Sequence, residues 1–234
     1  ITFLFLRKYL TWPQNFLLQI SRSFFLFLST VCFFYAISVI SLAEALTLSF
    51  VAPIIVTILS ALLLKEKVGV HRWSAVFVGF IGALIIIQPG IITINFASLA
   101  SLGAGVSYAF YLISTRKLSS FDNPYMTLIF TGVFGAIIIS FVVPFYWIMP
   151  NINQWLLMIG LAAVGTFAHF CLILSLKYAE ASKLAPLGYF EIVNNILIGY
   201  YFFGDFPNKW LWLGLFFIVS SGIYISIREV KKLN

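Results

Sequence analysis

The sequence predicts an all-α membrane protein whose helices cross a lipid bilayer many times. Of its residues, 62% are hydrophobic and only 9% are charged, whereas an ordinary soluble domain carries about a quarter charged residues. The mean hydropathy is +1.06. The apolar runs are long and do not alternate, which is typical of spanning helices of about 20 residues and not of barrel strands of about ten. Backbone groups in hydrocarbon must be satisfied within their own segment, so we interpret the runs as helices and exclude a soluble domain.

Charged residues and turn residues divide the chain into one partial span and eight full spans. The connections between them are short, so consecutive helices should run antiparallel. Four short runs are typical of turns: Gln88-Pro89-Gly90, Asp122-Asn123-Pro124, Pro150-Asn151 and Gly204-Asp205-Phe206-Pro207. The partial span is 1–12, and the full spans are 23–40, 43–64, 72–89, 97–115, 124–144, 153–176, 184–203 and 209–228.

The distribution of Lys and Arg predicts the orientation, because basic residues near helix ends are retained on the cytoplasmic side. One orientation places 13 of the 14 basic residues inside and leaves only Lys209 outside. The C-terminus is therefore expected in the cytoplasm. The same asymmetry explains the formal net charge of +7, so we expect a lipid bilayer around the protein and no nucleic-acid partner.

The beginning of the chain predicts a missing N-terminal segment. The sequence starts at Ile1 without a Met, and its first apolar stretch ends at Arg7, too early to span a bilayer or to complete a signal peptide. Cys32 and Cys171 both fall inside apolar runs, where buried and unreactive thiols are expected.

The two halves of the chain share a weak but ordered pattern. Ala43-Glu44-Ala45 in the first half corresponds to Ala179-Glu180-Ala181 in the second. Trp73 follows Glu66 by seven residues, as Trp212 follows Asp205. Five span boundaries separate these two acids, which places them on opposite sides of the membrane. Inverted repeats of this kind are typical of secondary transporters, although a chance match between apolar helices remains the alternative.

On these residues the sequence resembles the EamA family of the drug/metabolite transporter superfamily. The first matching block contains Ala43 to Phe50, Pro53, Leu64-Lys65-Glu66, Trp73, Gly79, Gly82 and Gln88-Pro89-Gly90. The second contains Ala185-Pro186-Leu187, Tyr189, Glu191-Ile192-Val193, Gly199, Phe203-Gly204-Asp205 and Ser221 to Tyr224.

The resemblance implies ten helices in two inverted five-helix halves that move small organic metabolites. It implies a first repeat at 1–90, without its first helix and part of its second, and a second repeat at 91–234. It also implies a bacterial cytoplasmic (inner) membrane. Two residues depart from the family pattern: Asp205 replaces the usual Glu, and Ile192 stands where the first half has Pro53. The second departure predicts a kink in the first half that the second half lacks.

Glu191 is the strongest candidate for a substrate-cavity residue. It lies about a third of the way into an apolar span, where an ionisable group costs at least about 2.5 kcal/mol and is functional by default. Asn195 lies one turn later on the same face, and Tyr189 and Asn194 flank Glu191. The alternative is that these groups only join helices or that Glu191 stays protonated.

Four further residues are candidates for the same cavity. They are His169 and Thr166, which lie at mid-depth in the span 153–176, and Tyr108 and Tyr111 in the span 97–115. Hydroxyl and aromatic groups suit an organic substrate, but each of these residues has an alternative as a packing residue.

Four acids at helix ends form a separate group, namely Glu44, Glu66, Glu180 and Asp205. We expect hydrated pairs or helix caps there, and at most a cytoplasmic gate or positioning role for Glu66. No catalytic constellation, metal-ligand spacing or phosphate loop occurs, so we expect no enzyme, metal or cofactor.

The sequence therefore predicts a secondary transporter of a small organic molecule, working by alternating access, with a coupling proton as an option at Glu191. A flippase or channel for an amphipathic molecule is the first alternative, and an intramembrane enzyme is the second.

Overall fold

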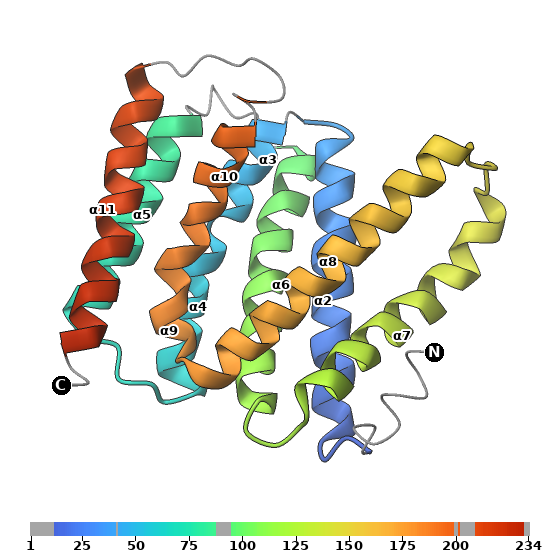
Figure 1. Cartoon of the computed structure of the whole chain (residues 1–234), viewed down its shortest axis with the longest axis horizontal. Coiled ribbons are helices and arrows are strands. Elements are labelled where there is room, and N and C mark those ends of the chain that lie inside the picture. The colour runs from blue at the N-terminus through green and yellow to red at the C-terminus, as the bar shows by residue number, and fades with distance from the viewer. Residues whose placement is uncertain (1–11, 41, 88–94, 199–200, 202–208, 232–234) are drawn as a thin grey trace. The chain divides into compact units, whose positions relative to one another are not determined.

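The computed structural model describes residues 12–40, 42–87, 95–198, 201 and 209–231, and these contain helices and no strand. The all-α prediction is confirmed. The helices are α2 (Phe16–Ile37), α3 (Leu42–Ser49), α4 (Ala52–Leu63), α5 (Val70–Ile87), α6 (Phe96–Leu118), α7 (Pro124–Val142), η1 (Val143–Phe145), α8 (Ile152–Tyr178), α9 (Ala181–Leu184), η2 (Ala185–Tyr189), α10 (Phe190–Ile198) and α11 (Lys209–Lys231) (Figure 1).

Within the described part of the chain, four helical segments are by length and composition apolar enough to cross a membrane: Phe16–Ile37, Phe96–Leu118, Pro124–Phe145 and Ile152–Tyr178. Three shorter apolar helices lie at Ala52–Leu63, Val70–Ile85 and Trp212–Tyr224. A helix overlaps each of the eight full spans predicted from the sequence, but two of these spans are interrupted. The partial span at 1–12 lies almost entirely outside the described residues, as do two of the predicted turns.

The two predicted turns that the structure describes begin helices through side-chain caps. The Asn123 side chain accepts a hydrogen bond from the Tyr125 amide at 3.0 Å, and Pro124 follows in the first turn. Asn151 and Gln154 cap α8 reciprocally, at 2.9 and 2.8 Å. Asn and Pro at these positions satisfy or remove amides that have no partner inside the helix.

By their packing, the described residues form two compact units. Unit 1 comprises the described residues of Ile1–Phe27 and Ser114–Ala179, and unit 2 comprises those of Leu28–Ile113 and Glu180–Asn234. Each unit draws on both predicted repeats, 1–90 and 91–234. The division into inverted repeats therefore stays a prediction.

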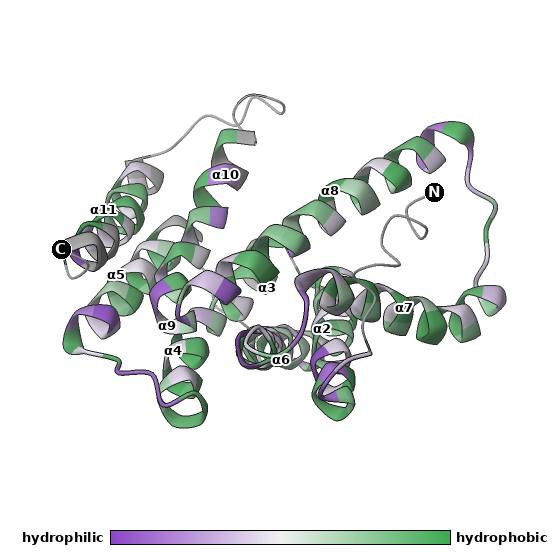
Figure 2. Ribbon diagram, turned by 60° about the horizontal axis from the view of Figure 1, so that its bottom comes forward, coloured by the Kyte–Doolittle hydropathy of each residue, from purple (hydrophilic) through white to green (hydrophobic). Residues whose placement is uncertain are grey.

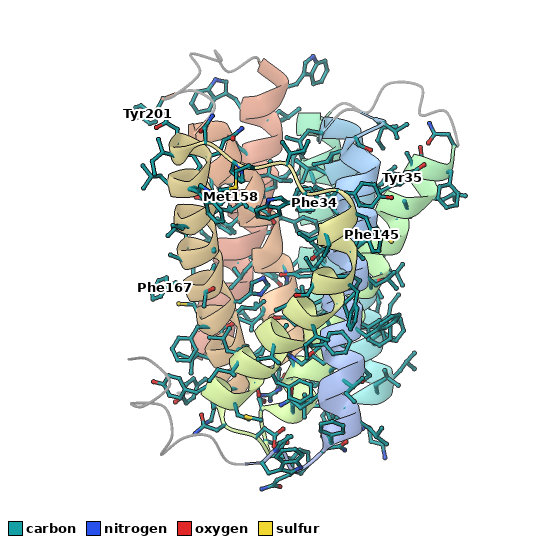
Figure 3. All side chains as sticks on the ribbon, turned by 90° about the vertical axis from the view of Figure 1, so that its right-hand side faces the viewer. Phe34, Tyr35, Phe145, Met158, Phe167 and Tyr201 are labelled. Atoms are coloured by element: carbon teal, nitrogen blue, oxygen red, sulfur yellow. The ribbon has the colours of Figure 1, made fainter. Side chains whose placement is uncertain are left out.

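Unit 1 is apolar on its outside. Phe145 and Phe167 project away from the ribbon (Figure 3) and are 83% and 69% exposed. Helices α7 and α8 are predominantly hydrophobic along their lengths (Figure 2). Such surfaces are costly in water but suit the hydrocarbon of a bilayer.

The core of unit 2 lies where α5 and α11 pack side by side (Figure 1). Small residues permit this close approach: a β-carbon on Gly82 would lie 2.9 Å from the carbonyl oxygen of Gly214. Small residues at such contacts are typical of membrane helices. The buried cluster beside this contact contains Phe50, Ala83, Tyr189, Ile192 and Ile218.

The predicted span 43–64 is divided into α3 and α4 just before Pro53, as that residue leads one to expect. The predicted span 184–203 is also interrupted, by the 3-10 turn η2 that contains Pro186. The expectation that Ile192 leaves the second half without a break is therefore wrong. Pro186, six residues earlier, supplies the interruption because it also lacks an amide hydrogen.

Candidate functional site

The two interrupted helices of unit 2 meet at their breaks. A β-carbon on Gly188 of η2 would lie 3.6 Å from Cγ of Pro53. The rings of Phe50 and Tyr189 lie 6.0 Å apart, centroid to centroid. Two breaks that are distant in the sequence thus form one local structure.

The first break is stabilised by its neighbours. Pro53 has no amide hydrogen to donate to the Ser49 carbonyl. The backbone of α6 approaches that carbonyl at Gly105, where a β-carbon would lie 2.5 Å from the oxygen. On the other side of the break, the Thr57 hydroxyl donates to the Pro53 carbonyl at 2.8 Å. The break therefore lies directly against the backbone of α6, and the first turn of α4 has an additional side-chain hydrogen bond.

Glu191 lies in the first turn of α10, directly after the second break. Its side chain is exposed, as is that of Asn194. The helix N-terminus favours a negative charge at this position. The side chain of Asn195, the third predicted polar residue of this helix, lies outside the description. An exposed acid on a membrane helix requires water, a substrate or a polar partner.

Two of the predicted tyrosines lie near this acid. Tyr108 is within electrostatic range of Glu191 and of Tyr111. The rings of Tyr108 and Tyr111 are stacked, with centroids 5.6 Å apart and an interplanar angle of 29°. Tyr111 is fully buried, whereas Tyr108 is half-buried. The structure thus brings Glu191 and Tyr108 into one neighbourhood.

Tyr189 has a different environment from the one expected of a cavity residue. It is 0% exposed and belongs to the apolar cluster of unit 2. Cδ2 of its ring would be 2.5 Å from a β-carbon on Gly79. Among the described residues its hydroxyl has no hydrogen-bond partner. Its surroundings are those of a packing residue behind Glu191.

Thr166 and His169 lie on α8 in unit 1. Thr166 is exposed, and His169 is half-buried within electrostatic range of Arg22. They belong to unit 1, whereas Glu191 belongs to unit 2.

Arg22 is a buried charge whose environment the sequence did not reveal. The distribution of basic residues predicts a position at a span end, yet Arg22 lies inside α2 and is 1% exposed. Its guanidinium donates to the Thr115 hydroxyl at 2.7 Å, to the Thr127 carbonyl at 3.2 Å and to the Thr131 hydroxyl. The signal that was available is spacing, since Gln19, Arg22 and Ser23 share one helical face.

Gln19 extends the Arg22 cluster toward the α6–α7 turn. Its amide donates to Asp122 at 2.8 Å and to Thr127 at 3.1 Å. The other carboxylate oxygen of Asp122 accepts a hydrogen bond from the backbone N–H of Gln14 at 2.9 Å. Arg22 and its neighbours therefore join the start of α2 to α7 and to the end of α6.

Two of the four helix-end acids meet in a polar cluster of unit 2. Glu66 follows α4 and accepts hydrogen bonds from the amides of Ala181 and Ser182, at 3.0 and 3.1 Å, and from the Ser182 hydroxyl at 2.7 Å. Arg72 pairs with Glu180 at 2.6 Å. Tertiary packing thus brings the first amides of α9 against Glu66, an arrangement of the helix-cap kind, which was one of the two alternatives expected for these acids. The Glu44 side chain and Asp205 lie outside the described residues.

Among the described residues no group of three His, Cys, Asp or Glu side chains is placed to hold a metal ion. The polar groups that the structure does bring together are single acids, tyrosines and hydrogen-bonded pairs within an apolar helical framework. Such a fold and site define an integral membrane protein built around two interrupted helices.

The chain belongs to the EamA-like transporter family, whose model matches residues 1–88 and 95–227. The resemblance found in the sequence is thereby confirmed. Among curated relatives, a riboflavin transporter of Vibrio cholerae is 35% identical over 197 residues, covering 81% of this chain and 64% of the relative. The chain thus spans just under two thirds of that relative's length.

A second curated relative supports the family, and a solved structure supports the fold. An S-adenosylmethionine uptake transporter of Rickettsia prowazekii is 26% identical over 216 residues, covering 92% of this chain and 74% of the relative. A crystal structure matches with a TM-score of 0.79 at 18% identity, covering 94% of this chain and 79% of the other. At that identity the crystal structure shows the fold alone.

Proposed function

We propose that this protein is a secondary transporter that moves a small organic metabolite across a bacterial cytoplasmic membrane by alternating access. The observation that carries the proposal is the contact between two interrupted helices, at Gly188 and Pro53, with Glu191 directly after one break. Interrupted helices in the two halves of a chain are the usual place of a transporter's substrate site.

Glu191 is the residue that we propose to contact the substrate or to exchange a coupling proton. Its exposed carboxylate suits a cationic or hydrogen-bonding group. Tyr108, half-buried and stacked on Tyr111, adds an aromatic surface with a polar tip. Asn194 offers a further polar group on the same turn, and Asn195, His169 and Thr166 stay predictions.

The relatives suggest the chemical class of the substrate. Two of them are named for riboflavin and for S-adenosylmethionine, and both of these molecules contain a flat heteroaromatic ring system. The stacked tyrosines suit such a ring. We therefore propose a heteroaromatic metabolite as the substrate class of this chain.

The arrangement in the membrane is part of the proposal. Residues 1–90 and 91–234 form two inverted repeats, and the C-terminus is cytoplasmic. The ordered sequence correspondences and the asymmetry of the 14 basic residues support this arrangement.

Counterflow in proteoliposomes tests the function directly. Vesicles loaded with unlabelled riboflavin or S-adenosylmethionine should accumulate the labelled compound transiently and saturably, because a carrier exchanges substrate across a closed membrane. Efflux without counterflow would instead indicate a channel. Mass analysis of the accumulated compound must show it unchanged, since a modified product would indicate an enzyme.

A further inference from the structure

The connection between α4 and α5 is hydrogen-bonded to the start of α9 through four side chains, which we call the clasp: Glu66, Arg72, Glu180 and Ser182. We propose that the clasp is a cytoplasmic gate, closed in this structure, that must open and re-form during each transport cycle. The proposal rests on the proposed function. The hydrogen bonds and the burial of the clasp residues are observations that do not depend on that function.

Glu66 forms the first half of the clasp. It receives the amides of Ala181 and Ser182 and the Ser182 hydroxyl, at distances of 2.7 to 3.1 Å. The backbone positions it, because Lys65 adopts a left-handed conformation with φ of 55° and the Glu66 amide donates to the Ser60 carbonyl at 3.1 Å. A non-Gly residue in this region is strained, so the contacts around it hold the turn in place.

Arg72 forms the second half from the first turn of α5. Its Nη1 lies 2.6 Å from Glu180 Oε2, and it also donates to the Ser182 hydroxyl at 2.9 Å and to the Lys67 carbonyl at 3.2 Å. Arg72 is 6% exposed, and Ser182 is 0% exposed. Lys183 adds a weaker contact to Glu180, at 3.7 Å.

The bonds of the clasp differ from those of the neighbouring α5–α11 contact. They are ionic or polar, whereas Gly82 of α5 packs closely against Gly214 and Ile218 of α11. Water can replace such bonds when they separate, whereas separating a packed apolar face exposes surface that water solvates poorly. The hydrophilic α4–α5 connection lies beside apolar helices (Figure 2). A reversible contact is therefore expected here and a permanent one at α5–α11.

The location of the clasp suits a gate. Lys65, Lys67, Arg72 and Lys183 all belong to the predicted cytoplasmic side. One side of the clasp comes from the predicted first repeat and the other from the second. When one repeat moves against the other, all the bonds of the clasp must break together or stay formed together. The clasp therefore has two states, closed and open.

A cleavable crosslink tests the need for opening. In a background with Cys32→Ala and Cys171→Ala, Lys67→Cys and Lys183→Cys, which flank the clasp and leave its four side chains in place, are joined by a short bis-thiosulfonate reagent. We expect counterflow to fall at least tenfold on crosslinking and to return with reductant. The proposal would be overturned if fully crosslinked protein exchanged substrate as fast as the protein whose crosslink has been cleaved by reductant, or faster.

The rate at which a buried cysteine is alkylated tests the clasp independently of any transport measurement. Ala181→Cys, at a site 1% exposed, should react slowly with a membrane-impermeant maleimide. Arg72→Glu should accelerate labelling at least tenfold, because it places two acids together. The swap Arg72→Glu with Glu180→Arg should return the rate to within about twofold of the parent.

The control is Val70→Cys, because Val70 is 79% exposed. This cysteine should react with the maleimide at the same rate in every variant. Unchanged labelling of Ala181→Cys by Arg72→Glu, or no recovery in the swap, would contradict the clasp. If no variant transports but the labelling pattern holds, the proposed function fails and the clasp stands.

Discussion

The Ser49 carbonyl oxygen lies 2.5 Å from the point where a β-carbon on Gly105 would be placed. This contact joins the break before Pro53 to the middle of α6. It also places a Cα–H group against a carbonyl that the proline does not satisfy, a weak but recurrent interaction between membrane helices. Gly105 has no room for a side chain here, because its neighbour is the backbone of Ser49 and not a flexible side chain that could move aside.

Gly105→Ala should therefore destabilise the protein. The added methyl group forces α6 away from the break, at a cost of about 1 to 3 kcal/mol, and should lower the apparent melting temperature in detergent by several degrees. Gly103→Ala is the matched control on the same helix, because nothing lies within 4 Å of its β-carbon. That variant should be neutral or slightly stabilised by helix propensity. Equal melting temperatures for the two variants would contradict the contact.

Glu191→Gln should abolish or uncouple transport while leaving the folded fraction unchanged. Gln keeps the volume and most of the hydrogen-bonding capacity, but it removes the charge and the titratable proton. Glu191→Asp should retain part of the activity. Initial uptake rates at two imposed pH gradients are the measurement.

Glu229→Gln, near the end of α11, is the control for Glu191→Gln. Glu66→Gln is unsuitable for this purpose because Glu66 belongs to the clasp. Uptake by Glu191→Gln at the wild-type rate, with unchanged pH dependence, would assign Glu191 to packing.

Arg22→Lys should lower the apparent melting temperature even though the charge is kept. A lysine ammonium cannot reproduce the guanidinium geometry that reaches Thr115, Thr127 and Thr131. Loss of one or two such buried bonds costs about 1 to 3 kcal/mol. Arg116→Lys is the matched control, because Arg116 is only half-buried and its Nη1 donates to the carbonyls of Leu176 and Lys177. A larger loss in Arg116→Lys would refute the ranking.

Tyr189→Phe should preserve transport and leave stability unchanged or raise it by about 1 kcal/mol, because a buried hydroxyl without a partner is costly. Tyr189→Ala should instead cost about 3 to 5 kcal/mol through the cavity that it opens. Thermal denaturation and counterflow of both variants provide the comparison. Loss of uptake in Tyr189→Phe at an unchanged melting temperature would show that the hydroxyl contacts the substrate.

A reporter that fluoresces only in the cytoplasm tests the topology. It should be bright when fused after Asn234 and dark when inserted at Asn151, because the basic residues are concentrated on one predicted side. The opposite pattern would invert the orientation and would place the clasp on the external face.

The sequence by itself was sufficient for features that depend on neighbouring residues. Apolar runs and their breaks predicted helices at the observed places. The turns predicted at Asn123 and Asn151 are each followed by a helix that these residues cap. The isolated acid Glu191 stood out because a charge within an apolar run is detectable at a single position. Local composition and backbone chemistry determine each of these features.

Only the tertiary structure decided which distant residues meet. Glu66 and Ser182 are 116 positions apart, and Arg22 and Thr115 are 93 apart. Nothing in the residues near Glu66 indicates that an amide of α9 will replace water around it, and nothing near Arg22 shows that hydroxyls of two other helices will bury it. Apolar helices pack in many ways with similar energy, so the partner of each polar group follows from the assembled bundle and not from its own segment.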